Sequence, residues 1–582
     1  MSVDDALRSA GRILRRRTSS VLPYYALAAA TADVTRLPLL VGLAVAFVAL
    51  ASTGRLGPLL DELAAVNPEL LRPDSPTGLP AAAGQRLADV LFSPSVVVPL
   101  GLAVVLAVVV SVLASGVTRA AALSAVDAAL REDDPLAAGV AGMRRWKTFA
   151  GLVLLRWVLF LVAGVPFLAA VVGGVATLGS VSDPAALDQG AAVAVLATLV
   201  GALVTLLAVV AVVVLLAFAG PAVVVDGRGL ASAVRRSVGV PFAHPVGFLV
   251  YGVVVVGSYV ALGVAAGLLG IAGVGRLVTV ASAFVVAPLL DAVAVSLYAD
   301  WTDADETSEA GEQRGAATES TTRRETGSSD DRVAAGTADE SGFVFGEGTT
   351  MESETGAERA DRAGEADVET TGTEAESASP AGTGGVVAAV RGALTDGLRE
   401  LGTFLREGWG YVVVSAVTLL AGVAGGWTVT AGSEVRIDPP ADPGSVFGLV
   451  PVGPFVNIAV NNWFVATTAG FSGLFGGLPT LGTLLFNGVL VGAVAGVVDP
   501  LVFAAFVGPH GVVELPAIAV AGGVGLRLGH VAWDVWRGTR PNAALADELE
   551  RTWRLVVGLL VVFVVAGFVE AFVTPQVAAA VL

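Results

Sequence analysis

The sequence has no cysteine, and only three of its 582 residues are histidines, namely His244, His510 and His530. The absence of cysteine excludes a disulfide framework, a thiolate metal site and thiol catalysis. Lysine is almost absent too, since Lys147 is the only one. No nucleophile motif, phosphate-binding loop, dinucleotide fingerprint or multi-histidine cluster occurs. We therefore expect a protein that is not an enzyme and that holds no cofactor.

Charged residues are scarce except in one stretch. They make up 15% of the chain, against 55% hydrophobic residues and a mean hydropathy of +0.78. This composition predicts a membrane protein with several spans, whose main partner is the lipid bilayer. The net charge is −17, and residues 302–380 alone hold 21 acidic and 6 basic residues, a net charge of −15. Because this soluble stretch would be repelled by phosphates, we expect no nucleic-acid partner.

Eleven apolar runs are long enough to cross a hydrocarbon layer of about 30 Å as helices. Six precede the acidic stretch, near 37–52, 94–118, 148–178, 190–225, 245–273 and 277–299. Five follow it, near 409–431, 456–475, 480–498, 511–533 and 555–573. We predict an all-α polytopic integral membrane protein with a six-helix domain over 1–301 and a second membrane domain over 385–582. The segment 302–384 is too poor in apolar residues to offset its chain entropy, which predicts a disordered linker.

The positions of the arginines predict the orientation, because short cytoplasmic loops are enriched in arginine and lysine. Arg15 to Arg17, the predicted loop from Arg119 to Lys147 and most later basic loops fall on one side. We therefore expect a multi-pass protein of the cell membrane with its N-terminus and linker in the cytoplasm and its C-terminus outside. Arg156 and Asp291 fall inside predicted spans, where they could pair, or Arg156 could extend to the bilayer edge.

Polar residues gather in the spans of the second half. They are Asn461, Asn462, Asn487, His510, Glu514 and Glu570. An unpaired polar group in a span costs a few kcal/mol, so we expect these side chains to face one another as a buried cluster. Three interpretations stay open, namely structural polar contacts, an ion or proton pathway, and a metal or catalytic site. The first of them predicts that Glu514→Leu destabilises this half.

His510 and Glu514 are four residues apart, so on a helix they project from the same face. Pro509 before them suits the first turn of that helix. The same spacing could serve a metal ion, for which Glu570 is the obvious further ligand.

Glycines indicate close helix packing beside these polar residues. Gly488, Gly492 and Gly496 recur every four residues and give a smooth helix face that a neighbour can approach. We assign to one helix-packing motif the residues Gly488, Gly492, Gly496, Pro509, Gly511 and Pro516.

Three stretches in the second half resemble the stage II sporulation protein M family. They are "VNIAVNNWFVATTAGFSGLFGGLPTLGTLLFNGVLVGA", "GPHGVVELPAIAVAGGVGLRLG" and "VEAFVTP", within roughly Arg391 to Leu582. The corresponding motif residues are Asn461, Asn462, Asn487, Gly488, Pro509, His510, Gly511, Glu514, Pro516 and Glu570. The resemblance implies a non-catalytic membrane scaffold with membrane or envelope protein partners, and a homo-oligomer is a further option.

The alternative is a protein that translocates an ion or small solute through the His/Glu/Asn cluster. A cavity between the spans would favour translocation, whereas dry packing with Glu514 hydrogen-bonded would favour the scaffold.

The first half is less informative. The stretch "FAGPAVVVDGRGLASAVRRSVGVPFAHPVGFLVYGVVVV" weakly resembles uncharacterised six-helix membrane domains that occur attached to some glycerophosphoryl diester phosphodiesterases. This resemblance implies no activity. The arginine bias, the acidic soluble segment and the abundance of alanine, valine and glycine resemble haloarchaeal proteins.

Overall fold

The computed structural model describes residues 3–58, 81–180, 184–302, 383–433, 436–440, 442, 444, 446–448 and 450–582. Nearly all of these residues are helical and none forms a strand, although Ile437 and Val498 make an isolated β-bridge. The predicted all-α fold is confirmed. The predicted linker over 302–384 lies almost wholly outside the described residues.

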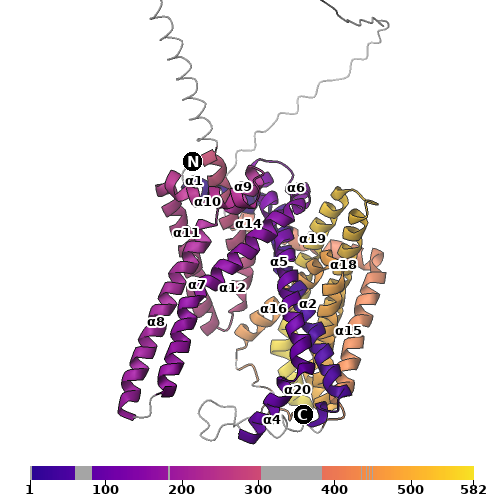
Figure 1. Ribbon diagram of the computed structural model, residues 1–582. Helices are drawn as coiled ribbons and strands as arrows, with labels where there is room; N and C mark the ends of the chain where they lie inside the picture. The colour runs from indigo at the N-terminus through magenta and orange to yellow at the C-terminus, as the bar shows by residue number, and fades with distance from the viewer. Residues whose placement is uncertain are drawn as a thin grey trace, which may run out of the picture. The chain divides into compact units, whose positions relative to one another are not determined.

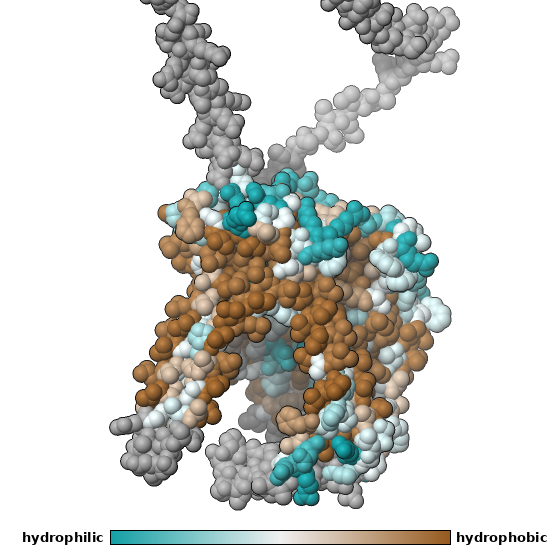
Figure 2. Space-filling view, in the orientation of Figure 1, coloured by the Kyte–Doolittle hydropathy of each residue, from teal (hydrophilic) through white to brown (hydrophobic). Residues whose placement is uncertain are grey.

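Within the described ranges, ten helical stretches are long and apolar enough to cross a membrane. They are Thr18–Ser52, Pro94–Leu130, Pro135–Thr177, Gly190–Val225, Pro245–Ile271, Arg276–Thr302, Trp409–Thr430, Leu478–Val497, Pro500–Trp536 and Asn542–Val581. Figure 2 shows hydrophobic residues over the middle of the visible face and hydrophilic ones gathered toward its two ends. Many large apolar side chains are exposed on these helices, as expected where lipid is the solvent.

Most of the described residues belong to helices. In the first half they are α1 (Val3–Arg16), α2 (Thr18–Ser52), α4 (Ala81–Leu91), α5 (Pro94–Leu130), α6 (Pro135–Gly142), α7 (Trp146–Ser180), α8 (Pro184–Leu215), α9 (Ala219–Val225), α10 (Leu230–Ala243), α11 (Pro245–Ile271) and α12 (Arg276–Ala281). The π-helical segment η3 (Ser282–Val286) continues α12 toward residue 302. Helices α7 and α8 lie side by side as a long hairpin (Figure 1).

The second half contains α14 (Thr383–Glu407), α15 (Trp409–Thr430), α16 (Val452–Ser472), α17 (Leu478–Val497), α18 (Pro500–Trp536), α19 (Asn542–Phe568), the π-helical η6 (Val569–Val573) and α20 (Thr574–Val581). Two of the predicted glycines bring α17 against α15. A Cβ atom added at Gly488 would lie 2.1 Å from the Leu419 carbonyl oxygen, and one at Gly492 would lie 1.9 Å from that of Val423. Only glycine permits this approach of two backbones.

These contacts advance in the same direction along both helices, so α15 and α17 are parallel. At the next step, a Cβ atom at Gly496 would meet the Thr430 hydroxyl at 2.0 Å. The chain must therefore cross back between them, and α16, with 21 residues, makes this crossing. The asparagines of α16 lower its mean hydropathy, so this helix is not among the ten stretches named above. With α16 included, the first half has six membrane crossings and the second half has five, as predicted. Helices α1 and α20 lie at opposite ends of the helical unit (Figure 1).

The two halves pack together into one compact unit, which contains residues 1–303 and 390–582. Helix α2 of the first half contacts α16, α17 and α19 of the second. The Phe284 ring of η3 lies 5.9 Å from the Trp463 ring and 5.5 Å from the Trp553 ring, measured between centroids. The amide of Asn457 in α16 donates to the Gly273 carbonyl and accepts the backbone N–H of Arg276 at 3.1 Å.

Two local predictions were wrong. Helix α18 begins at Pro500 rather than near 511, because Asp499 caps it by accepting the Leu501 N–H at 2.8 Å. Pro509 therefore lies inside the helix and not in its first turn. Since proline has no N–H, Pro509 and Pro516 each free a backbone carbonyl one turn earlier. Arg119, predicted in a loop, lies within α5.

Candidate functional site

Three of the predicted polar residues meet between α18 and η6. His510 and Glu514 project from one face of α18, and Glu570 approaches them from η6. One ligand atom of each side chain lies within 4.8 Å of the other two, and all three residues are half-buried. The spacing of four residues thus produces the predicted shared face, and a separate helix supplies the third group.

The π-helical turn at η6 positions Glu570. A π-helical turn admits one extra residue, so it changes which side chains face a neighbouring helix, and such turns are frequent at functional sites. Directly after η6, the Thr574 hydroxyl lies 3.4 Å from His510 Nδ1.

These side chains line a cavity of about 420 Å³. Its walls come from both halves, and the lining residues are Arg276, Asn457, Ile458, Asn461, Asn462, His510, Glu514 and Glu570. The Asn461 amide donates to the Asn462 side-chain oxygen at 3.2 Å. Hence α16, α18, η6 and the start of α12 line an open polar space between membrane spans.

The charges that line this cavity do not cancel. Glu514 and Glu570 face one guanidinium, that of Arg276, so with a neutral imidazole the formal charge is −1. Glu514 Oε2 is buried and has no hydrogen-bond partner among the described residues. An ionised carboxylate in such surroundings is costly unless a proton or a cation neutralises it. The cavity therefore needs one more positive charge.

The donor set suits a divalent metal ion. Imidazole nitrogen is a ligand for Zn²⁺ and Fe²⁺, whereas carboxylate and amide oxygens also suit Mn²⁺. Two ligands bound at about 2.1 Å in tetrahedral geometry lie about 3.4 Å apart. Small side-chain rotations would bring His510, Glu514 and Glu570 from their present spacing to that distance.

Asn487 lies apart from this cluster. Its amide donates to the Thr483 carbonyl at 2.7 Å, and it lines a second cavity of about 390 Å³ with Asp33 and Arg36 of α2. Asp33 is 4% exposed and pairs with Arg36 at 3.0 Å. We did not predict Asp33 because it precedes the expected first span at 37–52. A span extended back to Thr18 would have placed this acid in the membrane.

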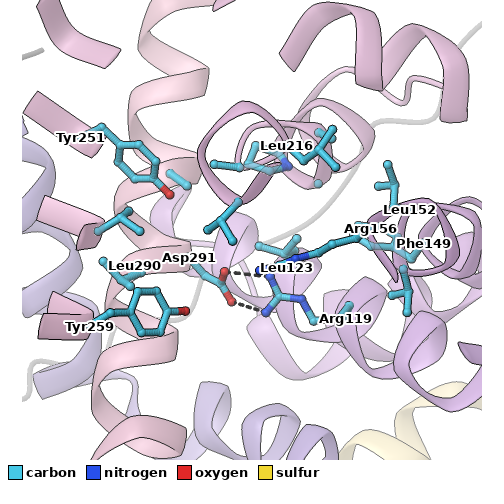
Figure 3. Close-up of a pocket in the computed structure, with 18 residues that line it drawn as sticks. Arg119, Leu123, Phe149, Leu152, Arg156, Leu216, Tyr251, Tyr259, Leu290 and Asp291 are labelled. Atoms are coloured by element: carbon cyan, nitrogen blue, oxygen red, sulfur yellow. Dashed lines mark hydrogen bonds and ion pairs between the residues drawn. The ribbon is translucent and has the colours of Figure 1, made fainter. Parts of the chain in front are cut away.

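A further polar site lies in the first half. Arg119 donates to both oxygens of Asp291, at 2.8 and 3.0 Å, and the Tyr25 hydroxyl donates to Asp291 Oδ2 at 2.7 Å. From the sequence, Arg156 could pair with Asp291 or extend to the bilayer edge, and in the structure Arg119 is the arginine that pairs with Asp291 (Figure 3).

Together the fold and the cavity define a polytopic helical membrane protein with an unbalanced polar site between its spans. Residues 414–575 match the family Stage II sporulation protein M (SpoIIM), which confirms the resemblance predicted for the C-terminal region. That range includes every predicted polar residue of the second half. The chain is also similar to an uncharacterised protein of Methanocaldococcus jannaschii, 25% identical over 129 residues that cover 21% of this chain and 72% of that protein. No solved structure matches.

Proposed function

We propose that the protein binds a cation in the cavity lined by His510, Glu514 and Glu570 and passes it across the membrane. The observation that carries this proposal is the buried Glu514 oxygen without a hydrogen-bond partner, in a cavity that is one positive charge short. Ionisable residues inside membrane proteins commonly lie on ion or proton paths. Mn²⁺, Fe²⁺ or Zn²⁺ fits the donor set, and a proton would use the same residues.

A purely structural cluster would look different. Its polar groups would be paired and the space between them filled, because an unpaired buried acid lowers stability without compensation. The roomy cavity and the unpartnered carboxylate therefore support a bound ligand. We further propose that the chain has no catalytic activity of its own.

We also propose that the N-terminus is cytoplasmic and the C-terminus outside, in accord with the arginine-rich loops. The absence of native cysteine makes a direct test possible. Single-cysteine variants Ser2→Cys and Leu582→Cys should react with a membrane-impermeant maleimide from opposite sides of intact cells. Labelling of both from the same side would contradict this orientation.

The test of translocation uses full-length protein in vesicles that enclose a metal-sensitive and a pH-sensitive dye. We expect external Mn²⁺ or Zn²⁺ to enter vesicles that hold the wild type, and Glu514→Gln to abolish entry. Glu550→Gln is the matched control. Glu550 lies on the same helical stretch as Glu570, but it pairs with Arg554, one turn further along that helix, and does not line the cavity. A response of the pH dye alone would identify the proton as the cation. Equal fluxes in wild type and Glu514→Gln would contradict the proposal.

The second candidate is a membrane scaffold, which the match to the SpoIIM family supports. Its test is crosslinking in native membranes followed by affinity purification and mass spectrometry. A reproducible set of envelope partners, together with no cation binding by the purified protein, would favour the scaffold over translocation.

A further inference from the structure

One cavity in the first half is lined by more basic than acidic side chains. A cavity of about 160 Å³ lies among α5, α7, the end of α8, α9, α11 and the helix over 287–302. Two guanidinium groups line it, those of Arg119 and Arg156, but Asp291 is the only acid among its lining residues. The cavity therefore has an excess charge of +1.

Both carboxylate oxygens of Asp291 already accept hydrogen bonds. Arg119 donates to both of its oxygens, and Tyr25 adds a third hydrogen bond. This bidentate pair neutralises Arg119. The Arg119 side chain still keeps 39% of its surface exposed and lines the cavity, so part of it is open to a ligand.

Arg156 is the residue with the excess charge. It lies in α7, inside the apolar stretch Pro135–Thr177. Its guanidinium stacks over the Phe160 ring at 5.2 Å, and no acid pairs with it among the described residues. Since a lone arginine in a span is costly, an anion beside it would stabilise the protein.

Two tyrosines complete the polar lining. Figure 3 shows the hydroxyls of Tyr251 and Tyr259 turned toward the side of Asp291 and the arginines, with Arg156 extending toward the Arg119–Asp291 pair. Neither hydroxyl makes a hydrogen bond within the described part of the chain, so both can donate to a ligand. Planar guanidinium groups together with hydroxyl donors suit tetrahedral oxyanions.

We propose that this cavity binds a phosphate group, supplied either by the headgroup of an anionic phospholipid or by a free phosphate compound. The volume admits about one such group. On α7, Leu154 and Val158 flank Arg156 and are 50% and 47% exposed, so acyl chains could lie against the helix while the headgroup enters. This site is separate from the cation cavity and does not depend on it.

The experiment uses full-length protein in a neutral detergent. Binding of phosphatidylglycerol, phosphatidylcholine and inorganic phosphate is followed by native mass spectrometry and by the shift in melting temperature. We expect phosphatidylglycerol to bind and stabilise the wild type more than phosphatidylcholine does. Arg156→Gln should weaken binding about tenfold, the effect of one charge-assisted hydrogen-bonded contact. Arg55→Gln, an exposed arginine at the end of α2, should change nothing.

Inorganic phosphate that displaces the lipid at millimolar concentration would identify a free phosphate compound as the ligand, and its failure to do so would identify the lipid. Equal binding by wild type and Arg156→Gln, or no binding of either ligand, would overturn the proposal. Should Arg156→Gln not fold, Tyr259→Phe must weaken binding instead. Glu514→Gln should bind like the wild type, which separates this proposal from that of cation transport.

Discussion

Two acids in the membrane, Asp291 of the first half and Glu514 of the second, have opposite surroundings. In the first half, three donors surround Asp291, and the charged group without an ionic partner among the described residues is the guanidinium of Arg156. In the second half, the charged group without a partner is a carboxylate, since Glu514 has a buried oxygen that accepts no hydrogen bond from the described residues. The unpaired group sets which ligand charge each site can accept.

The comparison separates stability from ligand binding. A fully paired charge holds helices together, and its loss leaves a partner unpaired in a poorly solvated place. An unpaired charge in a span lowers stability, but it is free to bind an ion. The predictions that follow probe this contrast, from the largest expected change in stability to the smallest.

The largest effect should come from breaking the Arg119–Asp291 pair. Asp291→Ala leaves two guanidinium groups without an acid, and we expect the free energy of unfolding to fall by about 3–5 kcal/mol. Unfolding in detergent measures it. Replacing both partners, Arg119→Met with Asp291→Leu, should recover most of the loss. A double variant as unstable as Asp291→Ala would show that the pair is not what the first half depends on.

The second prediction asks whether backbone packing, rather than charge pairing, stabilises the second half. A Cβ atom at Gly426 would lie 2.2 Å from the Val489 carbonyl oxygen, whereas nothing lies within 4 Å of one at Gly425. We expect Gly426→Ala to lower the free energy of unfolding by about 1–3 kcal/mol. Its neighbour Gly425→Ala should be neutral or stabilise the helix by up to about 1 kcal/mol. Similar effects of the two would contradict close packing of α15 on α17.

The third prediction concerns Glu514. Because its unpaired oxygen makes no hydrogen bond to lose, Glu514→Gln should change the free energy of unfolding by less than about 1 kcal/mol. The affinity for Mn²⁺ should nevertheless fall about 100-fold, as measured by titration calorimetry. From the sequence alone we expect Glu514→Leu to destabilise this half, and the same unfolding measurement on that variant tests this prediction. A large loss of stability in either variant would restore the structural interpretation.

The smallest effect should come from the pair of Arg551 with the exposed acid Glu407. Arg551 lowers the pKa of Glu407 below its ordinary 4.5 through a hydrogen bond of 2.9 Å and its charge. A lowered pKa in the folded state means that the pair stabilises the protein above pH 4.5 and loses this effect as the pH falls through the lowered value. Glu407→Gln should therefore flatten the acid side of a plot of melting temperature against pH. If the melting temperatures of the wild type and of Glu407→Gln fall in the same way at acid pH, the pair contributes no measurable stability.

The spans could be predicted because apolar length is a local property of the sequence. The shared face of His510 and Glu514 could be predicted as well, since residues four apart on a helix project from the same side. The start of α18 could have been found from Asp499 and Pro500, a capping residue followed by a first-turn proline.

Contacts between distant segments could not be predicted in this way. Arg119 and Asp291 are 172 residues apart, and Arg119 was predicted in a loop, so this pair became visible only with the packing of α5. Asn487 has the same polarity as Asn461, but the rotation of α17 that packs its glycines against α15 takes Asn487 to α2 instead. The π-helical turn at Glu570 depends on tertiary packing and left no local signal that we recognised.

The contact of Asn457 with the turn from Gly273 to Arg276 has a consequence for how the polypeptide is assembled. Gly273 adopts a φ of +73°, and the amide of Asn457 satisfies backbone groups on both sides of that turn, much as one subunit docks on another. The halves therefore resemble the partners of a heterodimer, and the connecting chain would serve as a tether that raises their effective concentration. Two separately expressed polypeptides, divided between residues 303 and 382, should still co-purify.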